Sequence, residues 1–195
     1  MADAGVATKS WRAIDELAEL VGVYCWVESR IFEICGAWAS GPATGDDSDP
    51  ALRVWCAGVS RRHGLLAARW YERLPVRAGV DAIALVTPPT GALADALDAL
   101  GTGARLPTGV AAMVEAVLPR LQGVYAAHWN TAMPVSEAPV LEVLAAAQRA
   151  VAGEVGVGRA LVEGTGEDLT RDAALVAELE RAFAATSVFP AVHTS

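Results

Sequence analysis

Apolar residues recur every three or four positions through four long stretches of this 195-residue chain, and one ionisable side chain interrupts each apolar stripe. Such spacing is typical of amphipathic helices that pack together in a bundle. The interrupting residues are Glu28, His63, His128 and Glu154. The periodicity therefore predicts an all-α fold. Because a buried charge is tolerated only when it is paired, any chemistry is expected where these four residues meet inside the bundle.

Capping residues and prolines set the bounds of the first two predicted helices. Ser10 is a candidate N-cap for a helix over about residues 11–39,. Asp49 followed by Pro50 is a strong start signal for the second helix, because proline at the first helical position loses no hydrogen bond. We expect this second helix to stop before Pro75.

A long crossover, residues 74–107, with a short helix near 91–100, separates the first pair of helices from the second pair. Thr108 and Ser136 are the expected N-caps of the third and fourth helices. Pro119 interrupts the third helix and predicts a kink, because proline removes one backbone hydrogen bond. A final amphipathic helix over about 169–184 is expected on the outside of the bundle,.

Composition and charge exclude several classes of function. The net charge of -8 argues against a nucleic-acid partner, which would need a basic face,. No uninterrupted apolar run reaches membrane-spanning length, and the start of the chain has no signal segment, so we expect a cytoplasmic protein without a membrane partner,. Cys25, Cys35 and Cys56 lack paired metal-ligand spacing and are expected to be reduced core residues,.

Two segments carry a resemblance to a known family. The first is LVGVYCWVESRIFE at residues 20–33, and the second combines SRRH at 60–63 with WYERLP at 70–75. The chain resembles the ferritin-like superfamily, and in particular actinobacterial proteins similar to the tRNA-modifying hydroxylase MiaE. The resemblance implies a four-helix bundle with a long crossover between its second and third long helices and, in metal-using members, oxygen activation at two irons.

The ligand pattern of di-iron bundles is only half preserved in this chain. In such bundles, each of two helical hairpins supplies a Glu from one helix and Glu-x-x-His from the next. By the resemblance, the ligand positions of the first hairpin are occupied by Glu28 and by Ser60-x-x-His63. Those of the second hairpin are occupied by Leu121 and by Glu154-x-x-Val157. Ser60, Leu121 and Val157 cannot replace a carboxylate or an imidazole, so a normal di-iron centre is not expected.

The retained groups suggest acid and base chemistry without a metal. A buried carboxylate next to an imidazole can exchange a proton near neutral pH, so Glu28, His63 and Glu154 are the predicted catalytic residues. The side chains expected to surround the substrate are Tyr24, Ser60, Leu121, Tyr125, His128 and Val157. Six tryptophans offer flat walls for a small apolar or aromatic molecule: Trp11, Trp26, Trp38, Trp55, Trp70 and Trp129,.

The sequence therefore predicts a single ferritin-like domain over residues 1–195, with a core bundle at about 11–164. Its predicted function is an acid/base rearrangement, elimination or cyclisation of an apolar substrate, without a cofactor. One alternative is a non-haem iron oxygenase that uses Glu28, His63 and Glu154 as ligands. Another is a non-catalytic binding or scaffold protein, in which the buried residues only fix helix register. A homodimer is compatible with all three.

Overall fold

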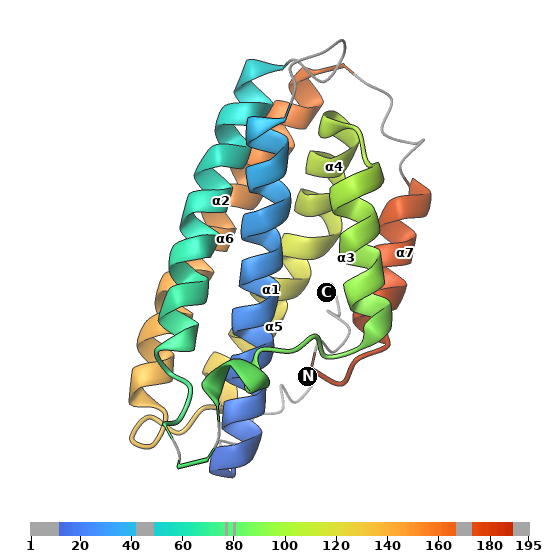
Figure 1. Ribbon diagram of the computed structural model, residues 1–195. Helices are drawn as coiled ribbons and strands as arrows, with labels where there is room; N and C mark the ends of the chain where they lie inside the picture. Colours follow the sequence, from blue (N-terminus) through green and yellow to red (C-terminus); the bar gives the residue numbers. More distant parts are fainter. Residues whose placement is uncertain (1–11, 42–48, 77, 80, 167–172, 189–195) are drawn as a thin grey trace, which may run out of the picture.

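The computed structural model describes residues 12–41, 49–76, 78–79, 81–166 and 173–188, and all regular secondary structure within them is helical (Figure 1). Among these residues, no helix is both long enough and apolar enough to cross a bilayer. The helices are α1 (Ile14–Ser40), α2 (Pro50–Tyr71), η2 (Ala82–Leu85), α3 (Gly91–Gly103), α4 (Leu106–Ala112), η3 (Met113–Val117), α5 (Leu118–Thr131), α6 (Ala138–Gly164) and α7 (Ala173–Ala184).

Four long helices form the bundle, because α4, η3 and α5 follow one another without a break (Figure 1). α1 packs against α2, α5 packs against α6, and α2 lies next to α6. Within each of the two pairs the helices are antiparallel, and the crossover with α3 returns the chain so that α2 and α4–α5 run the same way. α3 and α7 contact each other and cover one side of the bundle.

The N-cap predictions are right for the second helix and wrong for the third and fourth. Asp49 caps α2 as predicted, since its carboxylate accepts from the backbone N–H groups of Ala51 and Leu52. Thr108 instead lies inside α4, which begins after Arg105, and α6 begins after Glu137 and not after Ser136. Prolines explain both shifts: Pro107 and Pro139 lie within the first two positions of their helices, where no N–H is lost,.

The ends of two predicted helices cannot be compared in full. Ser10 and Trp11 lie outside the described residues, and α1 begins after Ala13, whose N–H is capped by the Glu16 carboxylate. The last helix is predicted from about residue 169, and of this stretch the structure describes α7 from Ala173 onward.

A kink was predicted at Pro119, and the structure has a π-helical turn in the third long helix just before this residue. Residues Met113–Val117 form this turn, and the N–H of Leu118 bonds to the carbonyl of Met113, five residues back. Proline has no N–H to donate to residue 115, and its ring clashes with that carbonyl in a regular α-helix. A wider turn relieves the clash, and such π-turns are frequent at functional sites.

Two glycines allow close packing around the bundle core. A Cβ at Gly22 in α1 would lie 2.0 Å from the carbonyl oxygen of Leu85, so the crossover backbone rests directly on this helix. A Cβ at Gly158 in α6 would lie 2.6 Å from Val114 and 2.7 Å from Trp55. Packing therefore explains Gly158, whereas a Cβ at Gly153 or Gly156 on the same helix would meet nothing within 4 Å.

These contrasting environments predict opposite effects of one added methyl group. Gly22→Ala should lower the free energy of unfolding by about 1–3 kcal/mol, because the crossover must move,. Gly156→Ala should raise it by about 0.5–1 kcal/mol, because alanine has the higher helix propensity and meets no neighbour,. Urea unfolding followed by circular dichroism measures both, and equal effects of the two substitutions would contradict the packing described.

Candidate functional site

The three predicted catalytic residues meet inside the bundle, although they come from three helices. Glu28 lies on α1, His63 on α2 and Glu154 on α6, and none is more than 2% exposed. The Nδ1 atom of His63 bonds to Glu28 Oε2, and its Nε2 atom lies 2.9 Å from Glu154 Oε2. The imidazole therefore bridges two carboxylates, and this convergence agrees with the sequence analysis.

Two further side chains complete this group, which we call the core ion cluster: Glu28, His63, Glu154, Tyr125 and Arg62. The Tyr125 hydroxyl donates to the second oxygen of Glu28 at 2.5 Å. Arg62 Nε donates to the second oxygen of Glu154 at 2.5 Å. Each carboxylate oxygen thus accepts a hydrogen bond. When His63 is protonated, its charge and that of Arg62 balance the negative charges of Glu28 and Glu154.

The two carboxylates hold His63 in its charged form. Burial lowers the pKa of an imidazole, but the charge of Glu28 and the hydrogen bonds to Glu154 and Glu28 outweigh it and raise the pKa of His63 to about 10,. His63 is therefore an imidazolium at neutral pH, with both ring nitrogens donating. Burial and the neighbouring Glu28 also raise the pKa of Tyr125 well above its usual value, so its hydroxyl stays protonated.

The arrangement of this cluster does not fit one metal ion. The two nitrogens of an imidazole point away from each other, and here each faces a different carboxylate. One ion could therefore not bind a nitrogen of His63 and both carboxylates with the side chains in these positions. Among the described residues, no group of three or more His, Cys, Asp or Glu side chains is arranged around a metal position.

His128 belongs to a second group, which we call the His128 cluster: His128, Tyr24, Glu137 and Arg12. His128 Nε2 lies 2.8 Å from Glu137 Oε2, and His128 Nδ1 lies 3.2 Å from the Tyr24 hydroxyl. Arg12 donates to both oxygens of Glu137, at 3.1 and 3.3 Å, and to Thr131 at 2.6 Å. The cluster therefore ties the start of α1 to the end of α5 and the start of α6.

The charge state of His128 is opposite to that of His63. Burial lowers the pKa of His128, and the positive charge of Arg12 lowers it further, against the opposing effect of Glu137. Burial raises the pKa of Glu137, but hydrogen bonds from His128 and the Met133 N–H, with Arg12, lower it overall. An ionised Glu137 only accepts, so neutral His128 carries its proton on Nε2 and accepts from Tyr24 at Nδ1.

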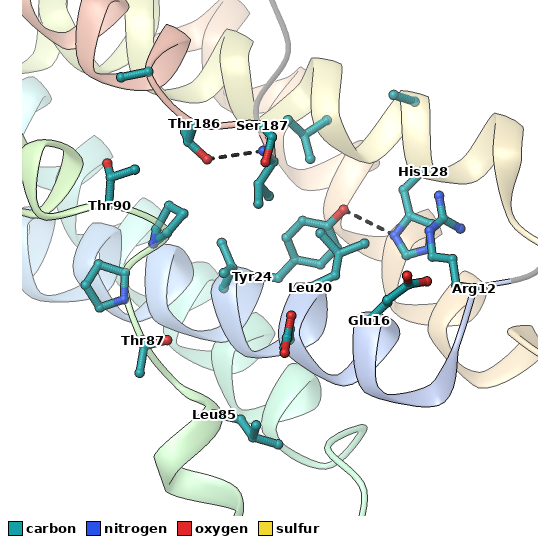
Figure 2. Close-up of a pocket in the computed structure, with 18 of the residues that line it drawn as sticks. Arg12, Glu16, Leu20, Tyr24, Leu85, Thr87, Thr90, His128, Thr186 and Ser187 are labelled. Atoms are coloured by element: carbon teal, nitrogen blue, oxygen red, sulfur yellow. Dashed lines mark hydrogen bonds between the residues drawn. The ribbon is translucent and has the colours of Figure 1, made fainter.

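A pocket of about 900 Å³ opens beside the His128 cluster, and Figure 2 shows Tyr24 and His128 at its wall. This volume lies in the range of roughly 300–1,000 Å³ usual for small-molecule sites. α1 and α5 form one side, and the crossover and the residues after α7 form the other. Apolar side chains make up much of the lining: Leu20, Val23, Leu85, Pro88, Pro89, Val124, Ala127 and Val188.

The two clusters meet through contacts between aromatic rings. The Tyr24 ring meets Tyr125 edge to face at 5.0 Å between centroids, and Trp70 lies 5.1 Å from Tyr24 and 5.9 Å from Tyr125. All three side chains are fully buried. The Tyr24 hydroxyl bonds to His128 and the Tyr125 hydroxyl to Glu28, so these two predicted substrate contacts belong to different clusters.

Three other predicted substrate contacts lie elsewhere. The Ser60 hydroxyl donates to the Phe32 carbonyl at 2.8 Å, in the seam between α1 and α2. Leu121 is fully buried in the hydrophobic core. The inward position predicted for Val157 is wrong, because this residue is 56% exposed. The buried stripe of α6 runs through Val151, Glu154 and Gly158. After Glu154, the residue four positions on, Gly158, faces inward, and the residue three positions on, Val157, does not,.

Sequence reasoning missed two residues that complete these clusters. Arg62 is next to His63 in the sequence and was not predicted to belong to the site, yet it pairs with the buried Glu154. Glu137 was not singled out, because it stands at a helix start outside any apolar stripe, and it is only 2% exposed. One signal could have indicated Glu137: it follows Ser136, the predicted start of the fourth helix, and acidic residues favour helix N-termini.

Of the six tryptophans, Trp11 lies outside the described residues and Trp70 is in the core.

Comparisons with models of protein families, with characterised proteins and with solved structures found no match to this chain. The resemblance to the ferritin-like superfamily therefore depends on the residues of its two segments, and it stays a prediction.

Removing the central imidazole should strongly destabilise the protein. His63→Ala leaves Glu28 and Glu154 buried without their shared partner, which should cost about 3–5 kcal/mol in the free energy of unfolding. Urea denaturation of the variant and of the unsubstituted protein measures this loss. Glu33→Gln is the control on the same helix as Glu28, since it removes an exposed pair with Arg30 and should change stability by less than about 1 kcal/mol,.

The stability contribution of His63 should also depend on pH in a defined direction. Its pKa in the folded state, about 10, exceeds the usual value of 6.5. The stabilisation is therefore complete below about pH 6.5 and is lost as the pH rises through about 10,. The difference in unfolding free energy between the unsubstituted protein and His63→Gln should shrink over that interval, and a difference that grows with pH would contradict the assigned charge state.

Proposed function

We propose that the protein is a metal-independent enzyme that rearranges, cyclises or eliminates a group from a small, largely apolar molecule by acid/base catalysis. The proposed site is the pocket beside the His128 cluster. The observation that carries this proposal is a neutral histidine, oriented by a buried carboxylate, at the wall of a pocket large enough for such a molecule,.

A proton route follows from the hydrogen bonds of this cluster. Tyr24 is fully buried in the structure, so in the proposed reaction the bound substrate displaces the groups that cover it. The substrate then gives a proton to the Tyr24 oxygen while the Tyr24 proton moves to His128 Nδ1. The protonated imidazole is stabilised by Glu137, 2.8 Å from Nε2. Return of the proton by the same path to a second substrate atom, or to a leaving group, completes the reaction and restores neutral His128.

The charge states favour His128 over His63 as the base. A base must be unprotonated at the working pH, and the lowered pKa of His128 meets this condition,. His63, with a pKa raised to about 10, is already protonated, and each of its nitrogens donates to a carboxylate, so it has no lone pair to accept a proton. Catalysis by Glu28, His63 and Glu154 remains a prediction, but their contacts support a structural role better.

A ferritin-like arrangement is the finer proposal for the fold. It is supported by two antiparallel helix pairs joined through a long crossover, with α2 and α4–α5 running in the same direction,. Glu28, His63 and Glu154 would then occupy three of the six positions that hold metal ligands in di-iron bundles. In this chain Tyr125 donates a hydrogen bond to Glu28, and Leu121, at another of the six positions, is fully buried.

Product analysis with a mixture of natural small molecules tests the proposed function. The purified protein is incubated with a protein-free extract of metabolites, and mass spectrometry compares the result with that of His128→Gln. We expect products that are isomers of their substrates or that have lost a leaving group, formed equally well with a chelator present. His128→Gln should lower the rate by about 10²–10⁴-fold, the usual contribution of a positioned base.

Trp129→Phe provides the matched control, because Trp129 is the next residue on α5 and is 43% exposed. It should leave the rate unchanged. Products that have gained an oxygen atom, lost when a chelator is added, would favour the iron oxygenase. Absence of any product, with ligand binding retained, would favour the non-catalytic binding protein.

A further inference from the structure

A second concave surface, which we call the α2–α6 groove, lies on the other side of the core ion cluster. Its volume is about 940 Å³, and it runs between α2 and α6. Trp55 and Glu154 lie at its buried side, while Val54 and Val157 are exposed along it, at 73% and 56%. The remaining lining residues are Pro50, Ala51, Gly58, Arg62, Arg149, Ala150, Gly153 and Leu161.

The charge of the groove is opposite to that of the chain. The protein carries a net charge of -8, yet two of the three charged side chains that line the groove are arginines, Arg62 and Arg149. The third, Glu154, has its two oxygens occupied by Arg62 and His63. Arg62 meets Glu154 through its Nε atom, and guanidinium has further donors for an anion,. The groove thus favours a negatively charged ligand.

The buried wall of the groove is held in a fixed position. The indole nitrogen of Trp55 donates to the backbone carbonyl of Glu154 at 3.2 Å. Gly158 leaves room for the same ring, since a Cβ there would lie 2.7 Å from it. A fixed aromatic wall with apolar neighbours suits a hydrocarbon or aromatic group, because little ordering is needed on binding.

The glycines of α6 indicate which part of the surface must stay open. Gly153 and Gly156 each cost roughly 1 kcal/mol relative to alanine in a helix, and neither has a neighbour within 4 Å of an added Cβ,. No packing contact among the described residues accounts for them. Gly153 lines the groove, however, and any side chain there would reduce its space, whereas Gly156 is not part of the lining.

We propose that the α2–α6 groove binds a small amphipathic carboxylate, with its apolar part against Trp55, Val54 and Val157 and its carboxylate at Arg62 and Arg149. This site is distinct from the proposed catalytic pocket and does not depend on its activity. The apolar lining supplies most of the affinity, and the two guanidinium groups select the negative head group.

Calorimetric titration of the full chain with octanoate tests this proposal, with octylamine as the probe of opposite charge. We expect saturable binding of octanoate and at least tenfold weaker binding of octylamine. Arg149→Gln should weaken octanoate binding by about 3–10-fold, as expected for one charge-assisted hydrogen bond in an open groove. Arg159→Gln should leave it unchanged, because that residue lies on the same helix but pairs with Glu115 outside the groove.

Two leucine substitutions separate filling of the groove from changes in helix stability. Gly153→Leu should abolish octanoate binding, and Gly156→Leu should not, although both replace an exposed glycine of α6. Thermal unfolding checks that both variants fold. Equal binding of octanoate and octylamine, unchanged binding by Gly153→Leu, or no saturable binding would overturn the proposal. A dimer that Gly153→Leu disrupts, in a protein that does not bind octanoate, would assign the groove to a second copy instead.

Discussion

The bundle depends on one charged hydrogen-bonded bridge, in which the His63 imidazolium joins Glu28 of α1 to Glu154 of α6. Burying three ionisable groups is unfavourable unless every charge is paired and every polar atom is bonded. Tyr125 and Arg62 complete that requirement from α5 and α2. Since all four long helices contribute, the bridge permits only one relative position of the helices along their axes.

The two buried histidines show how neighbouring groups decide the use of one residue type. His63 has a carboxylate at each nitrogen and is held protonated. His128 has one carboxylate, itself engaged by Arg12, and a tyrosine hydroxyl, so burial dominates and the ring stays neutral. Only the neutral ring lies beside a pocket that reaches solvent. The same chemical group thus supports the fold in one place and is suited to accept a proton in the other.

Helical periodicity was sufficient to predict the all-helical fold and the meeting of Glu28, His63 and Glu154, because residues on the apolar stripes of neighbouring helices must face one core. It could not place Glu137 or Arg12, which lie at helix ends, where no repeating pattern exists. The inward direction of Val157 was wrong, since packing of Gly158 against Trp55 and Val114 sets the rotation of α6. The two pockets could not be predicted from the sequence either, because their walls come from segments far apart in the chain.

The π-turn at Met113–Val117 has a consequence for everything that follows it in the chain. One additional residue in a turn rotates the downstream helix by about 100° relative to the upstream part. From the turn onward the buried residues Val114, Val117, Leu121, Tyr125 and His128 follow one another at intervals of three or four, as in a regular helix, so they share one face,. The π-turn thus sets the direction of that shared face, from which Tyr125 and His128 reach Glu28 and Tyr24, two partners on α1.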